Sequence, residues 1–74
     1  MEVETQDFYL SAFLRLKGLE LIDLKDYGQR SLFVFEDNEQ FQDLKKKYYW
    51  HEANVDPMAY KQAIRDLKGL TMNR

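Results

Sequence analysis

The run Ser-Leu-Phe-Val-Phe at residues 31–35 constrains the fold more than any other part of the chain. Its valine and two phenylalanines favour an extended strand. Because successive side chains of a strand point to opposite faces, Phe33 and Phe35 lie on one face. Leu32 and Val34 lie on the other face. Both faces are therefore apolar and need cover, whereas one layer of helices covers only one of them.

This strand is the second arm of an expected β-hairpin. Residues 20–25 predict the first arm, residues 26–29 (Asp-Tyr-Gly-Gln) predict the turn, and residues 30–36 predict the returning strand. A turn this short joins two strands that pair with each other in the most economical arrangement.

The first of three expected helices begins near Thr5 or Asp7, whose side chains can accept hydrogen bonds from first-turn amides, and ends at Gly18. Only Asp7, Ser11 and Arg15 form a polar stripe, and nearly every other position is apolar. A helix that is apolar around most of its circumference is covered on more than one side. The sequence therefore predicts that this helix lies at the centre of the domain.

A second helix is expected over residues 38–50, because Asp37 followed three residues later by Gln40 is a variant of the capping box. Its core-facing stripe consists of Phe41, Leu44 and Tyr48. The link that follows is short, and a short third strand near residues 52–55, alongside the hairpin, is an option that the sequence leaves open.

The third helix opens at Asp56-Pro57, a capping residue followed by proline at the first helical position, and Gly69 is expected to end it. Its inward-facing residues are Tyr60, Ala63, Ile64 and Leu67. Together these segments predict an α+β fold of order α-β-β-α-α, in which a β-hairpin packs on three helices.

The length of 74 residues predicts a single domain over residues 1–74, with an ordered core over about 5–70 and short tails. A chain this short buries about 60% of the surface that its unfolded form exposes, so its stability is marginal. The chain has no cysteine, and its lone His51 lacks converging ligands, so we expect no disulfide, metal or other cofactor. The chain can then gain further stability by docking on a protein partner or by forming a homodimer.

The charge is distributed unevenly along the chain, with a net charge of −2. Residues 1–40 carry nine acidic and four basic side chains, whereas residues 41–74 carry seven basic and four acidic ones. The acidic N-terminus is not typical of a targeting signal, and no apolar run approaches the roughly 20 residues that a membrane span needs. Together with the absence of cysteine, this favours a cytoplasmic protein with no membrane partner.

Signals for catalysis are weak. The three glycines are isolated and form no phosphate-binding loop, and neither Ser11 nor Ser31 lies in a nucleophile elbow. His51 is followed by Glu52, with Asp56 nearby, but an exposed loop histidine explains this cluster better than an acid–base site does. We therefore expect no enzyme and infer no small-molecule substrate.

Aromatic residues make up 15% of the chain, more than a small core buries easily. Aromatic side chains on a surface tend to mark protein contacts. The leading hypothesis is a non-enzymatic protein-interaction module that self-associates or docks on a larger protein. Its candidate interface is Leu32, Val34, Tyr27, Tyr49 and Trp50.

The alternative is an accessory protein that binds nucleic acid through its basic C-terminal half. Lysines next to aromatic residues can hold a phosphate backbone, and Trp50 could stack on a base. The candidate contacts are Lys46, Lys47, Lys61, Arg65 and Lys68. Against this hypothesis, the net charge is negative, and nonspecific binding draws its free energy mainly from neutralised phosphates.

Several short motifs follow one another in an order that resembles a known family. They are Asp7-x-Tyr9-Leu10-x-Ala12, Phe33-x-Phe35, Trp50, Val55-Asp56-Pro57 and Leu67-Lys68. Through these motifs, residues 5–70 resemble a family of small bacterial and phage proteins catalogued as a domain of unknown function. The resemblance implies a stand-alone α+β module from a phage or mobile element, and it carries no catalytic residues.

Overall fold

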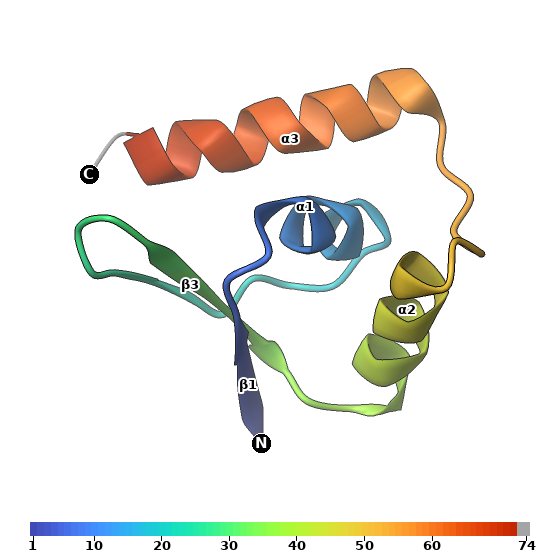
Figure 1. Cartoon of the computed structure of the whole chain (residues 1–74), viewed down its shortest axis with the longest axis horizontal. Helices are drawn as coiled ribbons and strands as arrows, with labels where there is room; N and C mark the ends of the chain where they lie inside the picture. The colour runs from blue at the N-terminus through green and yellow to red at the C-terminus, as the bar shows by residue number, and fades with distance from the viewer. Residues whose placement is uncertain (73–74) are drawn as a thin grey trace.

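The fold is described by a computed structural model that covers residues 1–72 (Figure 1). Its elements, in chain order, are β1 (Glu2–Thr5), α1 (Phe8–Leu16), β2 (Asp23–Asp26), β3 (Ser31–Glu36), α2 (Glu39–Tyr49) and α3 (Pro57–Met72). The predicted α+β class is confirmed, and the predicted hairpin is present as β2 and β3. The order of elements is β-α-β-β-α-α. The sequence predicted α-β-β-α-α, so the structure has one additional strand, β1, before the first helix.

The three strands form one antiparallel sheet of order β1-β3-β2. The third strand is therefore residues 2–5, within a segment expected to be mostly tail, and not residues 52–55. The option of a strand near residues 52–55 is not realised: this link is irregular, and the Lys17 ammonium donates to its Asn54 carbonyl oxygen at 2.8 Å. Residues 2–5 pair with residues 33–36, which makes β3 the central strand.

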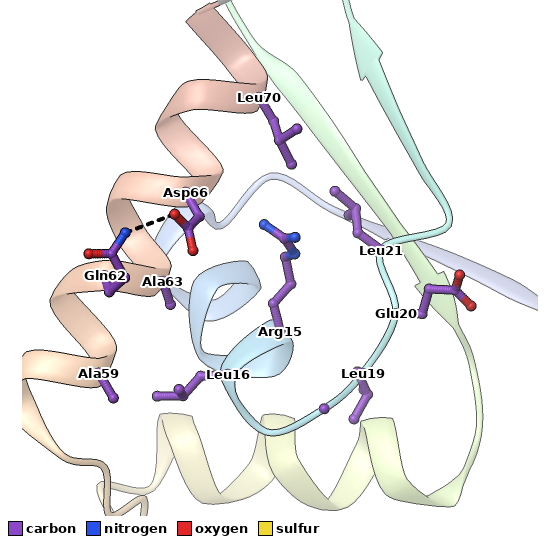
Figure 2. A pocket seen from close by; sticks show the side chains of 11 residues that line it. Arg15, Leu16, Leu19, Glu20, Leu21, Ala59, Gln62, Ala63, Asp66 and Leu70 are labelled. Carbon is purple, nitrogen blue, oxygen red and sulfur yellow. Dashed lines mark hydrogen bonds between the residues drawn. The ribbon is translucent and has the colours of Figure 1, made fainter.

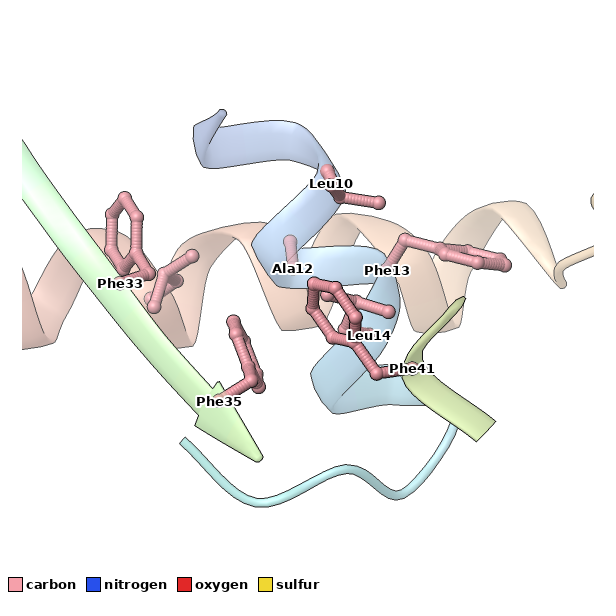
Figure 3. Close-up of a cluster of buried hydrophobic side chains, with 8 residues drawn as sticks. Leu10, Ala12, Phe13, Leu14, Phe33, Phe35 and Phe41 are labelled. Atoms are coloured by element: carbon pink, nitrogen blue, oxygen red, sulfur yellow. The ribbon is translucent and has the colours of Figure 1, made fainter. Parts of the chain in front are cut away.

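The inner face of the sheet carries Phe33 and Phe35, which point from β3 into the core (Figure 3). The Phe33 ring lies 6.0 Å from that of Phe8, next to the start of the first helix, and the Phe35 ring lies 6.1 Å from that of Phe41 on α2. The core thus joins the sheet to two helices through aromatic contacts. Its fully buried members are Leu10, Ala12, Phe13, Leu14, Phe33, Phe35, Phe41 and Leu67.

Helix α1 lies at the centre, as its apolar circumference predicted. It packs against α3 on one side and against α2 on another, and Figure 1 shows it between α3 and the sheet. Asp7 caps its first turn by accepting from the Leu10 amide at 3.0 Å. Gly18, at φ 99°, ends it. The Leu19 amide then bonds back to the Leu14 carbonyl, which is the expected glycine-stopped geometry.

Two helix ends differ from the prediction. Asn38, not Asp37, caps α2, because the extended backbone at Asn38 lets its side chain accept from the Phe41 amide at 2.8 Å. Asp37 instead accepts from the Gln42 side chain. Gly69 does not end α3, which continues to Met72. Its φ is not in the left-handed region, and a glycine inside a helix costs only about 1 kcal/mol.

Helix α3 begins as predicted. The Asp56 carboxylate accepts from the Ala59 amide at 2.8 Å, and Pro57 is the first helical residue. The inward stripe is also confirmed: Leu67 is buried, while Tyr60, Ala63 and Ile64 are partly buried and pack against the core. The last two residues of the expected tail lie outside the part of the chain that the structure describes.

Candidate functional site

The second apolar face of β3 is covered from within the sheet. Val34 is only 1% exposed and Leu32 is half-buried. Glu4 on β1 is paired with Val34, and Lys25 on β2 is paired with Leu32, so their side chains rise on this face from the two flanking strands. The Lys25 ammonium meets the Glu4 carboxylate at 2.6 Å, so the ion pair spans the central strand.

The electrostatics of this face reflect the same pair. The hydrogen bond from Lys25 to Glu4, followed by their charge attraction, raises the pKa of the Lys25 ammonium. By register, Glu2, Glu36 and Asp23 share this face with Lys25, and the Met1 ammonium pairs with the Glu36 carboxylate. The outer strands are four residues each and charged, features that discourage sheet edges from pairing with another chain.

The aromatic members of the candidate interface are exposed but lie apart. Tyr27 is in the hairpin turn, at the opposite side of the molecule from the end of α2, where Tyr49 and Trp50 lie (Figure 1). The Tyr49 hydroxyl donates to the Asp7 carboxylate at 2.6 Å and so ties α2 to the cap of α1. This bond, followed by partial burial, raises the pKa of Tyr49 to about 12. Trp50 is 69% exposed.

The basic candidates divide between two helices. On α2, the Lys47 ammonium pairs with Asp43 at 3.2 Å. Lys46 borders a surface hollow that also contains Glu39 and Asp43. On α3, the predicted outer ridge of Lys61, Arg65 and Lys68 is exposed along its length. The α2 lysines thus lie among carboxylates, which weakens them as phosphate contacts.

A concave groove lies between α3 and the end of α1, with a volume of about 600 Å³ (Figure 2). We call it the α1–α3 groove. Its lining residues are Arg15, Leu16, Gly18, Leu19, Glu20, Leu21, Ala59, Gln62, Ala63, Asp66 and Leu70. One wall is a face of α3, and the opposite wall is the segment that follows Gly18.

The side chains in this groove are mostly apolar, with one cation among them. Figure 2 shows Arg15 extending between Asp66 on α3 and Leu21 on the opposite wall, toward Leu70. Leu70 is 45% exposed although it is a large apolar residue. The Asp66 carboxylate accepts from the Gln62 amide group at 2.9 Å. Within residues 1–72, the Arg15 guanidinium has no hydrogen bond or ion pair.

The described part of the chain contains no other assembled chemical site. Residues 1–72 contain no group of three or more side chains placed to hold a metal ion. His51 is exposed and has a positive φ of 60°. None of the helices in these residues is both long enough and apolar enough to cross a membrane.

A small α+β domain, with a three-stranded antiparallel sheet and three helices, is the class that this geometry defines. Residues 1–73 match the family described as "Domain of unknown function (DUF5659)", and the chain belongs to that family. This membership agrees with the expectation of a family of unknown function. No curated protein and no solved structure matches the chain.

Sequence reasoning missed the α1–α3 groove. One signal was present, because Arg15 interrupts the last turn of a helix that is otherwise apolar. The other signal was hidden, because Leu70 was assigned to a helix stop after Gly69, whereas the continuing helix carries it along the groove wall. The groove depends on how α1 and α3 pack, which neither segment reveals alone.

Proposed function

We propose that this protein is a non-enzymatic protein-interaction module that docks on a larger protein through the α1–α3 groove. The observation that supports this is a groove of about 600 Å³ with leucine and alanine walls in a chain of 74 residues. That volume lies within the roughly 300–1,000 Å³ typical of ligand sites.

A protein segment suits the groove better than a small molecule does. The wall formed by α3 runs from Ala59 to Leu70, which is about 16 Å at the rise of an α-helix. A long and open groove offers contact along a chain, whereas small ligands favour enclosed pockets. The covered face of β3 moves the proposed interface away from Leu32 and Val34.

The size of the domain supports the same proposal. A short chain gains stability when a partner covers apolar surface that its own core leaves exposed. The proposal includes a cytoplasmic location, which draws on the lack of cysteine, and an origin in a phage or mobile element, which draws on the family resemblance. Self-association through the groove is an outcome that the test below distinguishes.

The test compares two variants of α3, in each of which one apolar residue is replaced by glutamate. Leu70→Glu places a charge in the groove, whereas Met58→Glu changes a more exposed apolar residue on the same helix that is not part of its lining. Each variant is used for affinity capture from the native host with nuclease present, after circular dichroism confirms folding. We expect the partner to be retained by wild type and Met58→Glu and lost by Leu70→Glu.

Two results would count against the proposal. If Leu70→Glu captures the same proteins as wild type, the groove is not the docking site. If capture depends on nucleic acid, so that nuclease abolishes it for every variant, the nucleic-acid alternative replaces the proposal. Recovery of untagged copies of the same chain would assign the groove to self-association, and light scattering would then give the stoichiometry.

A further inference from the structure

We infer that the α1–α3 groove takes an amphipathic helix of a partner protein, and that one carboxylate on that helix pairs with Arg15. The inference rests on the proposed function, because it names the chemistry of the segment that docks. It draws on three features of the groove: a guanidinium that makes no ion pair with residues 1–72, a helical wall of suitable length, and acidic rims.

Arg15 supplies the first feature. Arg15 is half-buried and lines the groove, and its guanidinium makes no hydrogen bond or ion pair with any of residues 1–72. One oxygen of the Asp66 carboxylate accepts from Gln62, and Asp66 forms no ion pair with Arg15. Figure 2 shows the Glu20 carboxylate directed away from Arg15. A guanidinium binds a carboxylate through two parallel hydrogen bonds. A carboxylate from outside the domain is the complementary group.

The partly apolar surroundings of Arg15 strengthen such a pair. Leu21 and Leu70 lie beside the guanidinium in Figure 2, and a bound segment would exclude more water from it. Charge pairs shielded from water are worth more than pairs on an open surface. An acidic group at this position would therefore provide specificity as well as affinity.

The wall formed by α3 indicates a helical segment. Its groove-lining residues recur with the spacing of one helix face: Ala59, Gln62, Ala63, Asp66 and Leu70. The stripe covers about three turns. Ala59 and Ala63 are small, so a second helix can approach closely, within the 8–10 Å separation typical of packed helices. Helices that dock in grooves present anchors at matching intervals.

The rims add a second requirement on charge. Glu20 on one side and Asp66 on the other give the groove two carboxylates against one guanidinium. A partner helix is therefore expected to carry its acidic residue toward the floor, over Arg15, and basic residues toward the rims. An all-acidic helix would be repelled, because like charges across an interface are costly.

The experiment is a display selection with helical peptides of about 14 residues, enough for about four turns. Apolar residues are kept on one face at helical spacing, and the central groove-facing position and the flanking positions are randomised. Wild type, Arg15→Gln and Leu70→Glu are used as baits, with folding of each checked by circular dichroism and thermal melting. We expect wild type to enrich Asp or Glu at the central position.

Selected peptides are then measured one at a time. Replacing the central acid by its amide is expected to weaken binding to wild type about tenfold, which corresponds to about 1.4 kcal/mol. The same replacement is expected to leave the affinity for Arg15→Gln unchanged. If the acid-to-amide replacement weakens binding to wild type and to Arg15→Gln by the same factor, the role of Arg15 is overturned.

The remaining outcomes separate the two proposals. Enrichment of helical peptides by wild type without preference for an acid overturns the inference and leaves the docking groove intact. Enrichment by wild type that is no greater than enrichment by Leu70→Glu overturns the docking groove, and the inference with it.

Discussion

Individual residues decide which surfaces of this domain are available. Val34 belongs to the apolar strand that first suggested an interface, yet the Glu4–Lys25 pair lies across it and it is 1% exposed. Arg15 shows the opposite case, since a single charged residue on a core helix extends into an open groove. At this scale, the neighbours of a residue decide its role more than its own chemistry does.

Val34→Asp is expected to unfold the domain or to destabilise it by about 3 kcal/mol or more, because it buries a charge without a partner. Urea denaturation followed by circular dichroism measures the effect. Tyr27→Asp, at an exposed turn residue, is the control and should change the free energy of unfolding by at most about 0.5 kcal/mol. A folded Val34→Asp variant with the wild-type midpoint would show that this face is open.

The Tyr49–Asp7 bond predicts how stability depends on alkaline pH. The pKa of the Tyr49 hydroxyl in the folded protein, about 12, exceeds its ordinary value of 10.0. The bond therefore contributes its full stabilisation below pH 10. This contribution is lost as the pH rises through about 12. Tyr49→Phe should therefore reduce the loss of stability between pH 10 and pH 12, measured by denaturation at several pH values. An unchanged pH profile would contradict the bond.

That variant has a spectroscopic readout as well. Burial also raises the pKa of Tyr60, whose hydroxyl donates to the Tyr9 carbonyl oxygen at 3.0 Å, so Tyr49 and Tyr60 both ionise late in the wild-type protein. In Tyr49→Phe, ultraviolet titration should show the late ionisation of Tyr60 without that of Tyr49. Loss of both late ionisations would indicate that the variant has unfolded.

At the scale of elements, the same residue type can end a helix or lie inside one. Gly18 ends α1 at φ 99°, with the Leu19 amide bonded back to Leu14. Gly69 lies within α3, which continues through Leu70 to Met72. The extra turn matters for the proposed function, because it places Leu70 on the groove wall.

This contrast predicts opposite effects of one substitution. Gly69→Ala should stabilise the domain by about 0.5–1 kcal/mol, since alanine favours the helix and its methyl group meets no atom within 4 Å. Gly18→Ala should destabilise it by about 1–2 kcal/mol, because a positive φ is strained for a residue with a Cβ. Thermal melting of both variants measures the difference. Equal shifts would place Gly69 outside the helix.

At the scale of the whole molecule, charge is segregated while its sum stays negative. The acidic side chains of Glu2, Asp23 and Glu36 gather on the outer sheet face, whereas the exposed basic ridge lies on α3. Lys47 on α2 pairs with Asp43 and Lys46 lies beside it. The ridge alone offers few phosphate contacts on a molecule of net charge −2.

We therefore expect no binding of single-stranded or duplex oligonucleotides at about 50 mM salt, where weak screening favours electrostatic binding. Fluorescence anisotropy measures it. The nucleic-acid alternative would instead be established by binding that weakens with salt. In that case, the slope of log affinity against log salt should fall by about 0.7–0.9 in each of Lys61→Ala, Arg65→Ala and Lys68→Ala. Trp50→Ala separates stacking from charge, because loss of a stacked base costs about 1–3 kcal/mol.

The sequence by itself determined the features that depend on near neighbours. The caps at Asp7 and Asp56 act over three residues, the stop at Gly18 depends on its own φ, and the apolar circumference of α1 requires cover wherever the rest of the chain lies. Local hydrogen bonding and side-chain periodicity are sufficient for these features, so the helices and the hairpin were predicted.

The tertiary structure alone decided the features that join distant segments. Residues 2–5 become a strand only because the backbone of residues 33–36 lies beside them, and Glu4 covers Val34 only because Lys25 stands on the other flanking strand. Likewise, Arg15 becomes a candidate ligand-binding residue only where α1 meets α3. Contacts between residues some 20 to 50 positions apart depend on the path of the whole chain, and local pattern carries no record of that path.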